Sequence, residues 1–480
     1  MKVFLFFMLL FLSLKAAEKP NVLLISIDDL NDWVGYMKGH PQAITPNMDK
    51  LAKRGVAFLD AHCTSPLCNP SRSSLLSGLR EEKTGVYNNS QKFNLKKFTL
   101  LPQYFAENGY ITYGSGKIHH QKVNKVFFQN AINPEQRWSP FQQSKSVQYT
   151  KSELAGKGSA NPVHIIKDGP GGKEYILPFN RMASDRSPDS TSGESFDWHA
   201  FELEDKDFGD GMVTDWTIEQ LKKHDPKKPF FLGLGFYRPH IPLYAPRKYF
   251  DMHPLDKVQL PEHREDDIDD LSPAAKKWAL EAVTAGLHSS VLKHDEWKKA
   301  AQAYLACVTF IDTQIGKVLD FLDKSPYADN TIIVLFSDHG WHLGEKQHWG
   351  KWTGWNDSTS VPFIIVPAGA KESKNCSQPV SLLDIYPTLI DMAGLPHKEL
   401  DGVSLKKQLI KPELKTERVV RTLFDKGNKA LISTDWRYIR YSDGSEELYN
   451  RLKDPHEFEN LFNKPEYKEA LEKMRSAKFQ

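Results

Sequence analysis

The segment that begins at Cys68 concentrates residues able to do chemistry. It reads Cys-Asn-Pro-Ser-Arg and ends at Arg72. Pro70 fixes the turn after the cysteine, and we predict that residues 71–77 form a helix whose free N–H groups and positive dipole end face Cys68. The alternative is a cysteine packed in the core beside the start of a helix. By itself, the segment indicates a thiol in surroundings that favour an anion.

Two pairs of residues place acidic groups at the predicted ends of strands. Asp28 and Asp29 follow one apolar run, and Asp338 and His339 follow another. Adjacent carboxylates are costly to bury unless a cation or strong donors compensate their charge. A hard divalent metal is a natural compensator, although an Asp-Asp pair after a strand is also a common turn or helix cap. We predict that the two strand ends converge on one ion.

Basic side chains follow the other predicted strands. They are Lys117 with His119 and His120, then His240, and finally Lys351 in the loop after the second acidic pair. A single lysine or histidine is more often a solvated surface group. These side chains, however, are expected at one edge of the sheet. With the arginine of the cysteine segment they predict a positive pocket that favours a small anionic group such as sulfate.

Apolar runs that alternate with helical patterns must position these side chains. The strands lack polar alternation, so we predict an α/β fold with a large mixed, mostly parallel sheet flanked by helices on both faces. In such sheets, ligands bind beyond the carboxyl ends of the strands. We predict strands at 21–27, 110–113, 229–236, 331–336 and 361–366, and helices at 47–54, 101–108 and 304–322.

The chain divides into a leader, a main domain and a smaller terminal part. Residues 1–17 read as a signal peptide, because a charged tip and an apolar run precede small residues suited to cleavage. Within the main domain, 18–413, the stretch 123–215 is rich in Gly, Ser, Asn, Asp and Pro, so we expect loops laid over the sheet. For residues 414–480 we predict a small α+β subdomain whose antiparallel sheet includes a hairpin over 429–442.

Composition limits the classes of partner. The 480 residues include 63 Lys and Arg against 61 Asp and Glu, a formal charge of +2, so net charge gives no support for nucleic-acid binding. The apolar run of the leader is well short of the roughly 20 residues that a spanning helix needs. We therefore expect export to the periplasm or the medium, with no membrane attachment after cleavage.

Four cysteines are too few for a disulfide scaffold in a chain of this size. They are Cys63, Cys68, Cys307 and Cys376, so at most two bridges are possible. If Cys68 carries chemistry, an odd number remains, and at least one further thiol stays free.

The motif Cys-x-Pro-Ser-Arg, with Gly78 and Arg80 downstream, closely resembles the signature of the sulfatase family. From residue 21 to the tail, the chain resembles the iduronate-2-sulfatase-like branch of that family. Characteristic stretches are Ser26-Ile-Asp-Asp-Leu30, Gly116-Lys-Ile-His-His120 and Ser337-Asp-His-Gly-Trp-His-Leu-Gly-Glu345. The resemblance implies an alkaline-phosphatase-like sulfatase fold in which 18–413 is the catalytic domain.

The resemblance also implies the cofactors. Family members carry a Cα-formylglycine in place of the signature cysteine, so a formylglycine-generating maturation enzyme would convert Cys68. They use an aspartate-rich Ca²⁺ site, which corresponds here to Asp28, Asp29, Asp338 and His339, completed by residue 68. An Asn commonly fills the place of the histidine in relatives, and imidazole is unusual on calcium.

Catalytic roles follow from the same resemblance. Residue 68, as the hydrated aldehyde polarised by Arg72, would supply the nucleophile that attacks sulfur. Lys117, Lys351 and Ca²⁺ would hold the sulfuryl oxygens.

Two histidines would move protons in the implied mechanism. His240 is the candidate general acid for the leaving oxygen. The histidine that deprotonates the second hydroxyl of residue 68 is His120 by the spacing of the iduronate-2-sulfatase-like branch, or His119 by the spacing of arylsulfatase-like members. The branch favours His120.

The branch further implies a sulfated carbohydrate substrate, such as a glycosaminoglycan or an algal polysaccharide like ulvan or carrageenan. Action at a non-reducing end is expected if the pocket is closed. Side chains of the stretch 123–215 are expected to shape the sugar subsites, namely Trp138, Arg181, Arg186, Trp198 and His199.

Two other functions compete with this interpretation. A phosphomonoesterase or phosphodiesterase of the alkaline-phosphatase-like class would normally use Ser or Thr as nucleophile and two metals. A non-catalytic pseudo-sulfatase that binds sulfated glycans would carry a damaged signature or lack the acidic ligands. The sequence shows neither pattern.

Overall fold

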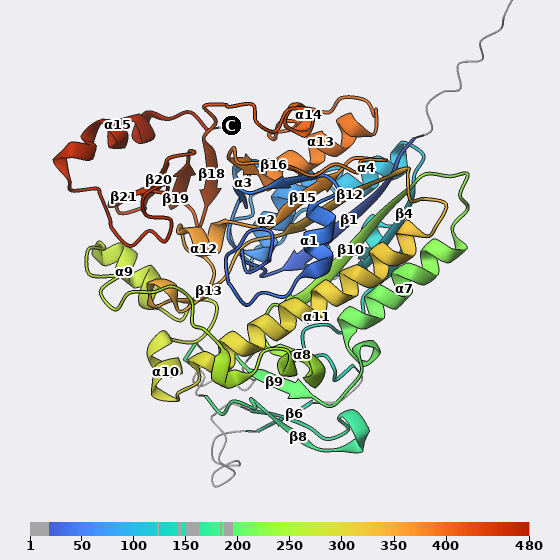
Figure 1. Cartoon of the computed structure of the whole chain (residues 1–480), viewed down its shortest axis with the longest axis horizontal. Coiled ribbons are helices and arrows are strands. Elements are labelled where there is room, and N and C mark those ends of the chain that lie inside the picture. The colour runs from blue at the N-terminus through green and yellow to red at the C-terminus, as the bar shows by residue number, and fades with distance from the viewer. Residues whose placement is uncertain are drawn as a thin grey trace, which may run out of the picture.

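A central sheet of eight strands carries most of the apolar runs (Figure 1). The computed structural model describes residues 19–121, 124–142, 146–149, 163–182, 185–186 and 195–479. Neighbouring strands are parallel except that β15 runs antiparallel to both β12 and β2, which confirms the predicted mixed, mostly parallel sheet. The order is β16 (Lys374–Cys376), β2 (Val56–Phe58), β15 (Phe363–Val366), β12 (Thr331–Ser337), β1 (Asn21–Asp28), β10 (Phe230–Pro239), β4 (Ile111–Gly116) and β5 (Asn130–Ile132).

Helices cover both faces of this sheet. Side chains of β1 alternate between two apolar clusters, with Leu23 in one and Leu24 in the other, because successive strand residues point to opposite faces. Figure 1 shows α7 and α11 on one side of the sheet and α4, α13 and α14 on the other. The first cluster includes α1 (Pro46–Ala52), α7 (Gly209–Lys223) and α11 (Trp297–Asp323), and the second includes α2 (Cys68–Ser77), α4 (Leu101–Glu107), α13 (Ile385–Met392) and α14 (Lys406–Ile410).

Four consecutive strands of the sheet deliver the predicted site residues to one edge. Strands β12, β1, β10 and β4 are parallel neighbours, so their carboxyl ends lie side by side. Asp28 ends β1, Asp338 follows β12, His240 follows β10 and Lys117 follows β4. The fold therefore gathers acids and bases from distant parts of the chain, as expected for parallel sheets.

The prediction of loops alone over 123–215 was wrong. In the described part of this stretch, β5 extends the main sheet beside β4, and α7 begins at Gly209. Strands of three or four residues in a composition rich in turn formers give too little periodicity to be recognised from sequence. The stretch also holds a three-stranded antiparallel sheet and a strand that pairs with β11 (Leu243–Pro246), namely β6 (Ser146–Tyr149), β7 (Val163–Ile166), β8 (Tyr175–Leu177) and β9 (Trp198–Phe201).

The C-terminal residues form the predicted antiparallel sheet. Its four strands follow one another in chain order, β18 (Val420–Leu423), β19 (Lys429–Ile432), β20 (Trp436–Arg440) and β21 (Glu446–Asn450). Leu471 and Met474 of α15 (Lys468–Ser476) pack against this sheet. Figure 1 shows the sheet and α15 beside the main sheet, at the left of the view.

Shorter elements connect these layers. They are the strands β3 (Ala61–His62), β13 (His342–Leu343), β14 (Trp349–Gly350) and β17 (Val380–Ser381), and the helices α3 (Glu81–Thr84), α5 (Asn124–Phe127), α8 (Arg247–Asp251), α9 (Pro273–Leu280), α10 (His288–Lys293) and α12 (Asn356–Thr359).

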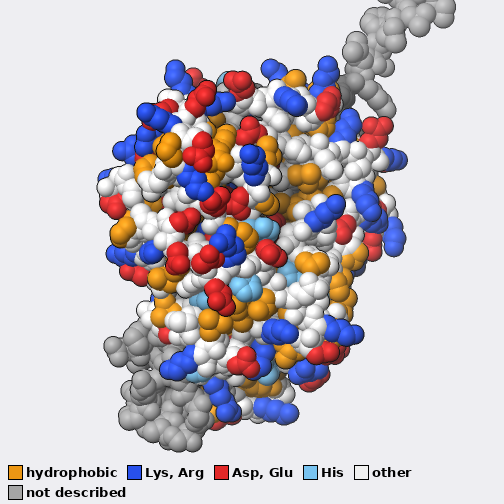
Figure 2. Space-filling view, turned by 60° about the vertical axis from the view of Figure 1, so that its left-hand side comes forward, with side chains coloured by type: hydrophobic (Ala, Val, Ile, Leu, Met, Phe, Trp, Pro, Cys, Tyr) orange, Lys and Arg blue, Asp and Glu red, His pale blue; other side chains and the backbone are white. Residues whose placement is uncertain are grey.

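The predicted signal peptide, residues 1–17, lies outside the described residues. Among the helices that are described, none is long and apolar enough to cross a membrane. All four cysteines are buried free thiols. Figure 2 shows basic and acidic side chains interspersed over the face in view, in keeping with the near-neutral composition.

Candidate active site

Cys68 is the first residue of α2, three residues earlier than predicted. The helix accommodates Pro70 in its first turn because a nitrogen there has no intrahelical acceptor to lose. The backbone N–H of Asn69 donates to Asn89 Oδ1 at 2.9 Å. Cys68 is 1% exposed and sits at the positive end of the helix dipole, the environment expected from the sequence.

Donors surround the sulfur of Cys68. Lys351 Nζ lies 3.1 Å from Sγ, His339 Nε2 lies 3.4 Å away and Lys117 Nζ lies 3.6 Å away. Although burial raises the pKa of a thiol, the charges of Lys117 and Lys351, with His339 and a hydrogen bond from His120, hold the pKa of Cys68 well below its usual value. Position 68 therefore favours a negatively charged group.

Three fully buried carboxylates lie beside this sulfur. Asp28, Asp29 and Asp338 are each 0% exposed. Ligand atoms of Asp28, Cys68, Asp338 and His339 all lie within 4.8 Å of one another, and so do those of Asp28, Asp29, Cys68 and His240. The structure thus brings together every predicted metal ligand, and it places His240, predicted as a catalytic residue and not as a ligand, next to them.

The donor set fits a hard divalent cation. Asp29 Oδ2 is buried and has no hydrogen-bond partner among the described residues. Burial raises the pKa of Asp29 to about 7. The charge of Lys351 lowers this pKa, and the charge of Asp28 raises it further. A cation would give Asp29 Oδ2 the partner that it lacks among the described residues, and carboxylate oxygens are ligands that Ca²⁺ prefers.

Arg72 orients two of these acids. Its Nε donates to Asp338 Oδ2 at 2.8 Å and its Nη2 donates to Asp28 Oδ1 at 3.2 Å. Its Nη1 donates to Ser26 Oγ at 2.9 Å. The side chain is buried, and despite that burial the acids raise its pKa above the usual value. Arg72 contacts the acids, not the sulfur, and this indicates a role in positioning the metal ligands.

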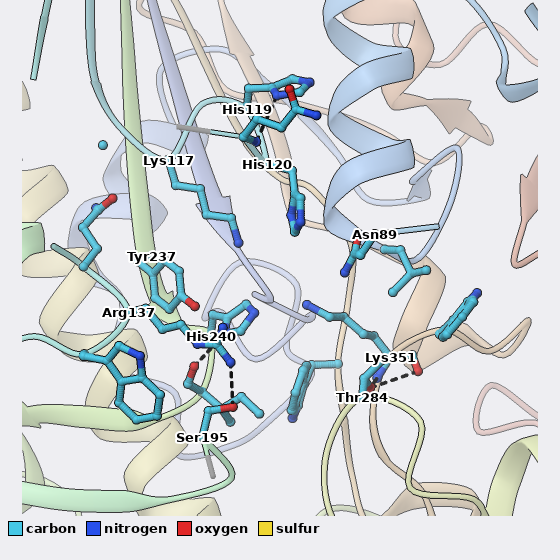
Figure 3. A pocket seen from close by; sticks show the side chains of 18 of the residues that line it. Asn89, Lys117, His119, His120, Arg137, Ser195, Tyr237, His240, Thr284 and Lys351 are labelled. Atoms are coloured by element: carbon cyan, nitrogen blue, oxygen red, sulfur yellow. Dashed lines mark hydrogen bonds between the residues drawn. The ribbon is translucent and has the colours of Figure 1, made fainter. Parts of the chain in front are cut away.

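His119 and His120 lie on opposite sides of their strand end. In Figure 3 the ring of His120 points into the pocket between the ends of Lys117 and Lys351, whereas His119 is turned away. His119 Nδ1 accepts from the backbone N–H of Gln121 at 3.1 Å, and burial lowers the pKa of His119 to about 3. The geometry favours His120 as the histidine that acts on residue 68.

His240 faces the acids from β10. Its Nδ1 donates to the carbonyl of Ile241 at 2.7 Å, so Nε2 holds the lone pair of the neutral ring. Nε2 lies 3.8 Å from Asp29 Oδ2, and the His240 side chain also hydrogen-bonds Cys68. Burial and the nearby charge of Lys351 lower the pKa of His240 to about 3. Without a bound anion, His240 is therefore neutral at physiological pH.

These basic groups open into a cavity of about 770 Å³ (Figure 3). Trp138 and Arg186 line it as predicted, but Trp198, His199 and Arg181 do not. Trp198 is buried and donates to Glu296 Oε2 at 2.8 Å, and His199 stacks on Phe179.

Sequence analysis missed Asn89, Arg137 and Tyr237, which also line this cavity. Lys117 lies over the Tyr237 ring at 4.8 Å. The position of Tyr237 at the carboxyl end of β10, three residues before His240, was a usable signal. Asn89 and Arg137 lie in segments without periodicity.

Comparison with known proteins decides the family. Residues 20–395 match the sulfatase family model. A sulfatase from Formosa agariphila is 35% identical over 472 residues, covering 96% of this chain and 87% of that protein. The chain belongs to the sulfatase family.

Other matches agree with this sulfatase assignment. Human iduronate 2-sulfatase is 30% identical over 412 residues, covering 78% of this chain and 69% of that protein. Residues 344–479 match the model of the N-sulphoglucosamine sulphohydrolase C-terminal region. The chain is a sulfuric ester hydrolase with relatives in the iduronate 2-sulfatase branch.

Solved structures share the sulfatase fold. A 2-O glycosaminoglycan sulfatase, BT1596, superposes with a TM-score of 0.67 at 23% identity, over 95% of this chain and 90% of that one. A phosphonate monoester hydrolase from Silicibacter pomeroyi gives a TM-score of 0.72 at 20% identity, over 95% and 94% of the two chains. The fold alone therefore does not separate sulfate from phosphonate esters.

Proposed function

We propose that this sulfatase removes sulfate from a sugar of a sulfated polysaccharide or its oligosaccharides, with Cys68 converted to Cα-formylglycine and Ca²⁺ at the acidic site. The observation that carries the proposal is the convergence of Lys117, Lys351 and His120 on a buried cysteine that is itself in contact with the metal-ligand set.

Charge at the site suits an anionic ester. Three buried carboxylates, Asp28, Asp29 and Asp338, face three cations, Arg72, Lys117 and Lys351. These charges balance, so a divalent ion held by the acids and His339 would leave the pocket positive. Ca²⁺ would supply that positive charge next to the sulfuryl oxygens, where a low-dielectric site makes it effective.

The side chains divide the remaining tasks. Formylglycine at position 68 would supply, as its hydrate, a hydroxyl nucleophile for sulfur. Lys117 and Lys351 would hold the sulfuryl oxygens, since their amino groups already lie within 3.6 Å of the atom at that position. His120 would accept the proton that residue 68 releases when sulfate departs.

His240 would protonate the leaving oxygen. Because the neighbouring lysines are one cause of its lowered pKa, a sulfate group bound between them would raise that pKa and let Nε2 carry the proton. General acid catalysis of this kind contributes about 10²- to 10⁴-fold.

The cavity supports a sulfated sugar that carries a second negative group. Arg137 and Arg186 line it with Trp138, and a volume of about 770 Å³ is in the range of small-ligand sites. Two matched proteins are named as acting on iduronate 2-sulfate and as a 2-O glycosaminoglycan sulfatase. We propose a uronate-containing substrate, from glycosaminoglycan or an algal polysaccharide such as ulvan, cleaved at a non-reducing end.

Export and maturation complete the proposal. The leader would direct the chain to the periplasm or the medium, and a formylglycine-generating enzyme of the host would have to act on Cys68. Production without such an enzyme should yield folded, inactive protein.

Mass spectrometry of the peptide that contains Cys68 tests the nucleophile. Conversion of the thiol to the aldehyde removes about 18 Da, whereas further oxidation of a thiol would add mass. Cys68→Ala should abolish sulfate release, while the matched variant Cys307→Ala, also a buried free thiol, should retain it. An unmodified thiol in fully active protein would overturn the proposal.

The assay panel separates the rival functions. Sulfate release should be measured on defined sulfated uronate oligosaccharides, together with phosphate and phosphonate monoesters. Faster turnover of the phosphorus esters would favour the phosphoesterase class, and binding without turnover by converted protein would favour a pseudo-sulfatase.

A further inference from the structure

A second group of metal-ligating side chains lies at the base of the loop that presents Lys351. It consists of His342, Glu345 and Asp357, whose ligand atoms all lie within 4.8 Å of one another. His342 belongs to β13 and Asp357 to α12, so the group brackets Lys351 in the chain. None of the roles proposed above uses these three residues.

His342 offers a free nitrogen to this group. The side chain is fully buried, and its Nε2 donates to Thr353 Oγ1 at 2.9 Å. The Thr353 hydroxyl can donate in turn to Ser358 Oγ at 2.8 Å, an arrangement that suits the tautomer with the ring proton on Nε2 and the lone pair on Nδ1. Nδ1 is buried, has no hydrogen-bond partner in the part of the chain that the structure describes, and lies 3.6 Å from Asp357 Oδ2. Metal-binding histidines typically show this arrangement, with the second nitrogen donating to an outer partner.

The carboxylates around His342 repel one another. Burial raises the pKa of Glu345 to about 7, and Asp32 adds to the rise. Burial, Glu345 and Asp32 likewise raise the pKa of Asp357 well above its usual value. The side chain of Asp357 is 25% exposed, so an ion can reach the group.

The nearby cationic side chains do not fully offset the repulsion between these carboxylates. Lys346 lowers the pKa of Asp357, but its amino group is paired with buried Asp267 and also contacts the carbonyl of Glu457. Burial raises the pKa of Asp32, and His456, which is exposed in the C-terminal part, offsets only part of that rise. A bound cation would satisfy the histidine nitrogen and the carboxylates together.

We propose that His342, Glu345 and Asp357 bind a divalent transition-metal ion, of the Zn²⁺ or Mn²⁺ class, at a site separate from the Ca²⁺ site. One imidazole nitrogen among three ligands favours such ions, whereas Ca²⁺ and Mg²⁺ prefer oxygen ligands. Because its ligands bracket 346–356, the ion would fix the base of the segment that carries Lys351.

Zn²⁺ binding to the full chain tests this site. The experiment uses Cys68→Ala protein, which removes the thiol that could bind Zn²⁺ in the active site. After chelation and reloading with excess Ca²⁺, we expect one equivalent of Zn²⁺ by titration calorimetry and elemental analysis. Co²⁺ in place of Zn²⁺ should give the visible absorption of a nitrogen- and oxygen-ligated ion.

Variants assign the bound ion to its ligands. In the same background, His342→Ala and the near-isosteric Asp357→Asn should each lose the Zn²⁺ equivalent. Thr353→Val, which removes the partner of Nε2, should weaken binding by about 10- to 100-fold. Asp391→Asn is the control. It changes a carboxylate elsewhere on the surface, where Asp391 pairs with Lys406, and this variant should bind Zn²⁺ normally.

Two results would overturn the proposal. One is a Cys68→Ala protein that is folded by circular dichroism and takes up no Zn²⁺ beyond Ca²⁺. The other is Zn²⁺ uptake that survives both His342→Ala and Asp357→Asn. Because metal content is measured and not turnover, neither result depends on the sulfatase activity.

Discussion

At the scale of single residues, the protonation state of His240 sets a limit on catalysis. Its lowered pKa, about 3, means that the free protein holds this imidazole neutral, although the proposed role needs a proton on Nε2. The negative charge of the bound substrate must therefore raise the pKa of His240 enough for Nε2 to be protonated. Substrates whose leaving groups differ in their need for a proton can therefore distinguish general acid catalysis by His240 from a role in binding.

We predict that His240→Ala loses about 10²- to 10⁴-fold in kcat/KM on a sulfated sugar but far less on p-nitrophenyl sulfate. The sugar alkoxide is a poor leaving group and needs protonation, whereas p-nitrophenolate leaves without it. Parallel kinetics on the two substrates check this. An equal loss on both would show that His240 does not act as the general acid.

The adjacent histidines give a second prediction at this scale. His120→Ala should abolish turnover, because His120 alone of the two points at residue 68. His119→Gln is the matched control. Since His119 packs beside Phe93 and Phe127, away from the pocket centre, this change should lower the thermal midpoint while kcat stays within a few fold. Loss of turnover in His119→Gln with near-normal kcat in His120→Ala would instead assign the proton-accepting role to His119.

At the scale of elements, α11 holds the acidic turn in place. Asp29 has a left-handed backbone, φ 61°, at the end of β1. Tyr304 of α11 donates its hydroxyl proton to the carbonyl of Asp29 at 2.7 Å, and its oxygen accepts from the N–H of Asn31 at 2.9 Å. A helix far from β1 in sequence thus positions a predicted metal ligand.

We predict that Tyr304→Phe weakens Ca²⁺ binding and turnover while the fold persists. The change leaves the buried N–H of Asn31 and the carbonyl of Asp29 without their partner, which costs about 1–3 kcal/mol. Titration of chelated protein with Ca²⁺ measures the effect. Tyr327→Phe removes a similar buried hydrogen bond, to the carbonyl of His224 at 2.7 Å, and should not alter Ca²⁺ affinity. Equal Ca²⁺ affinity in Tyr304→Phe and the natural sequence would contradict this.

At the scale of the whole molecule, a largely buried ion pair, Arg451–Asp60, joins the C-terminal sheet to the segment that follows β2 of the main sheet. Arg451 Nη1, just after β21, donates to Asp60 Oδ2 at 3.0 Å, and His62 Nε2 lies 2.8 Å from Asp60 Oδ1. Although burial raises the pKa of Asp60, Arg451 and His62 hold it below its usual value. The ionised form is therefore favoured in the folded protein.

This pair predicts the direction of a pH dependence. A carboxyl whose pKa is depressed by folding stabilises the protein above the unfolded pKa of about 3.9, and that contribution is lost as the pH falls further. Asp60→Asn should lower the free energy of unfolding by about 3–5 kcal/mol at pH 7, and by progressively less below about pH 4. Urea unfolding across this range measures both proteins.

Asp329→Asn is the control for this series, because its pair with Lys371 is exposed, with side chains 82% and 81% accessible. It should match the natural sequence at every pH. A deficit in Asp60→Asn that stays constant down to pH 3 would contradict the linkage.

Local sequence patterns were enough to predict the sheet type and the residue types that gather at the site. Short apolar runs such as 331–336 without polar alternation are typical of strands buried on both faces, and the spacing of Tyr304, Val308 and Ile311 predicted most of α11. The acidic and basic residues that follow each strand were candidate site residues, because the carboxyl ends of parallel strands lie at one edge of the sheet. These features are local, so periodicity and motif reveal them.

Which side chains meet at the site follows from contacts between distant segments of the chain. The direction of His120 into the pocket, the pairing of Arg72 with Asp28 and Asp338, and the arrival of Tyr304 behind Asp29 depend on contacts between segments up to 275 residues apart. The same is true of β5 at the sheet edge, a strand of three residues whose identity comes from its neighbour β4. Such contacts are fixed by packing and sheet order, which no local pattern encodes.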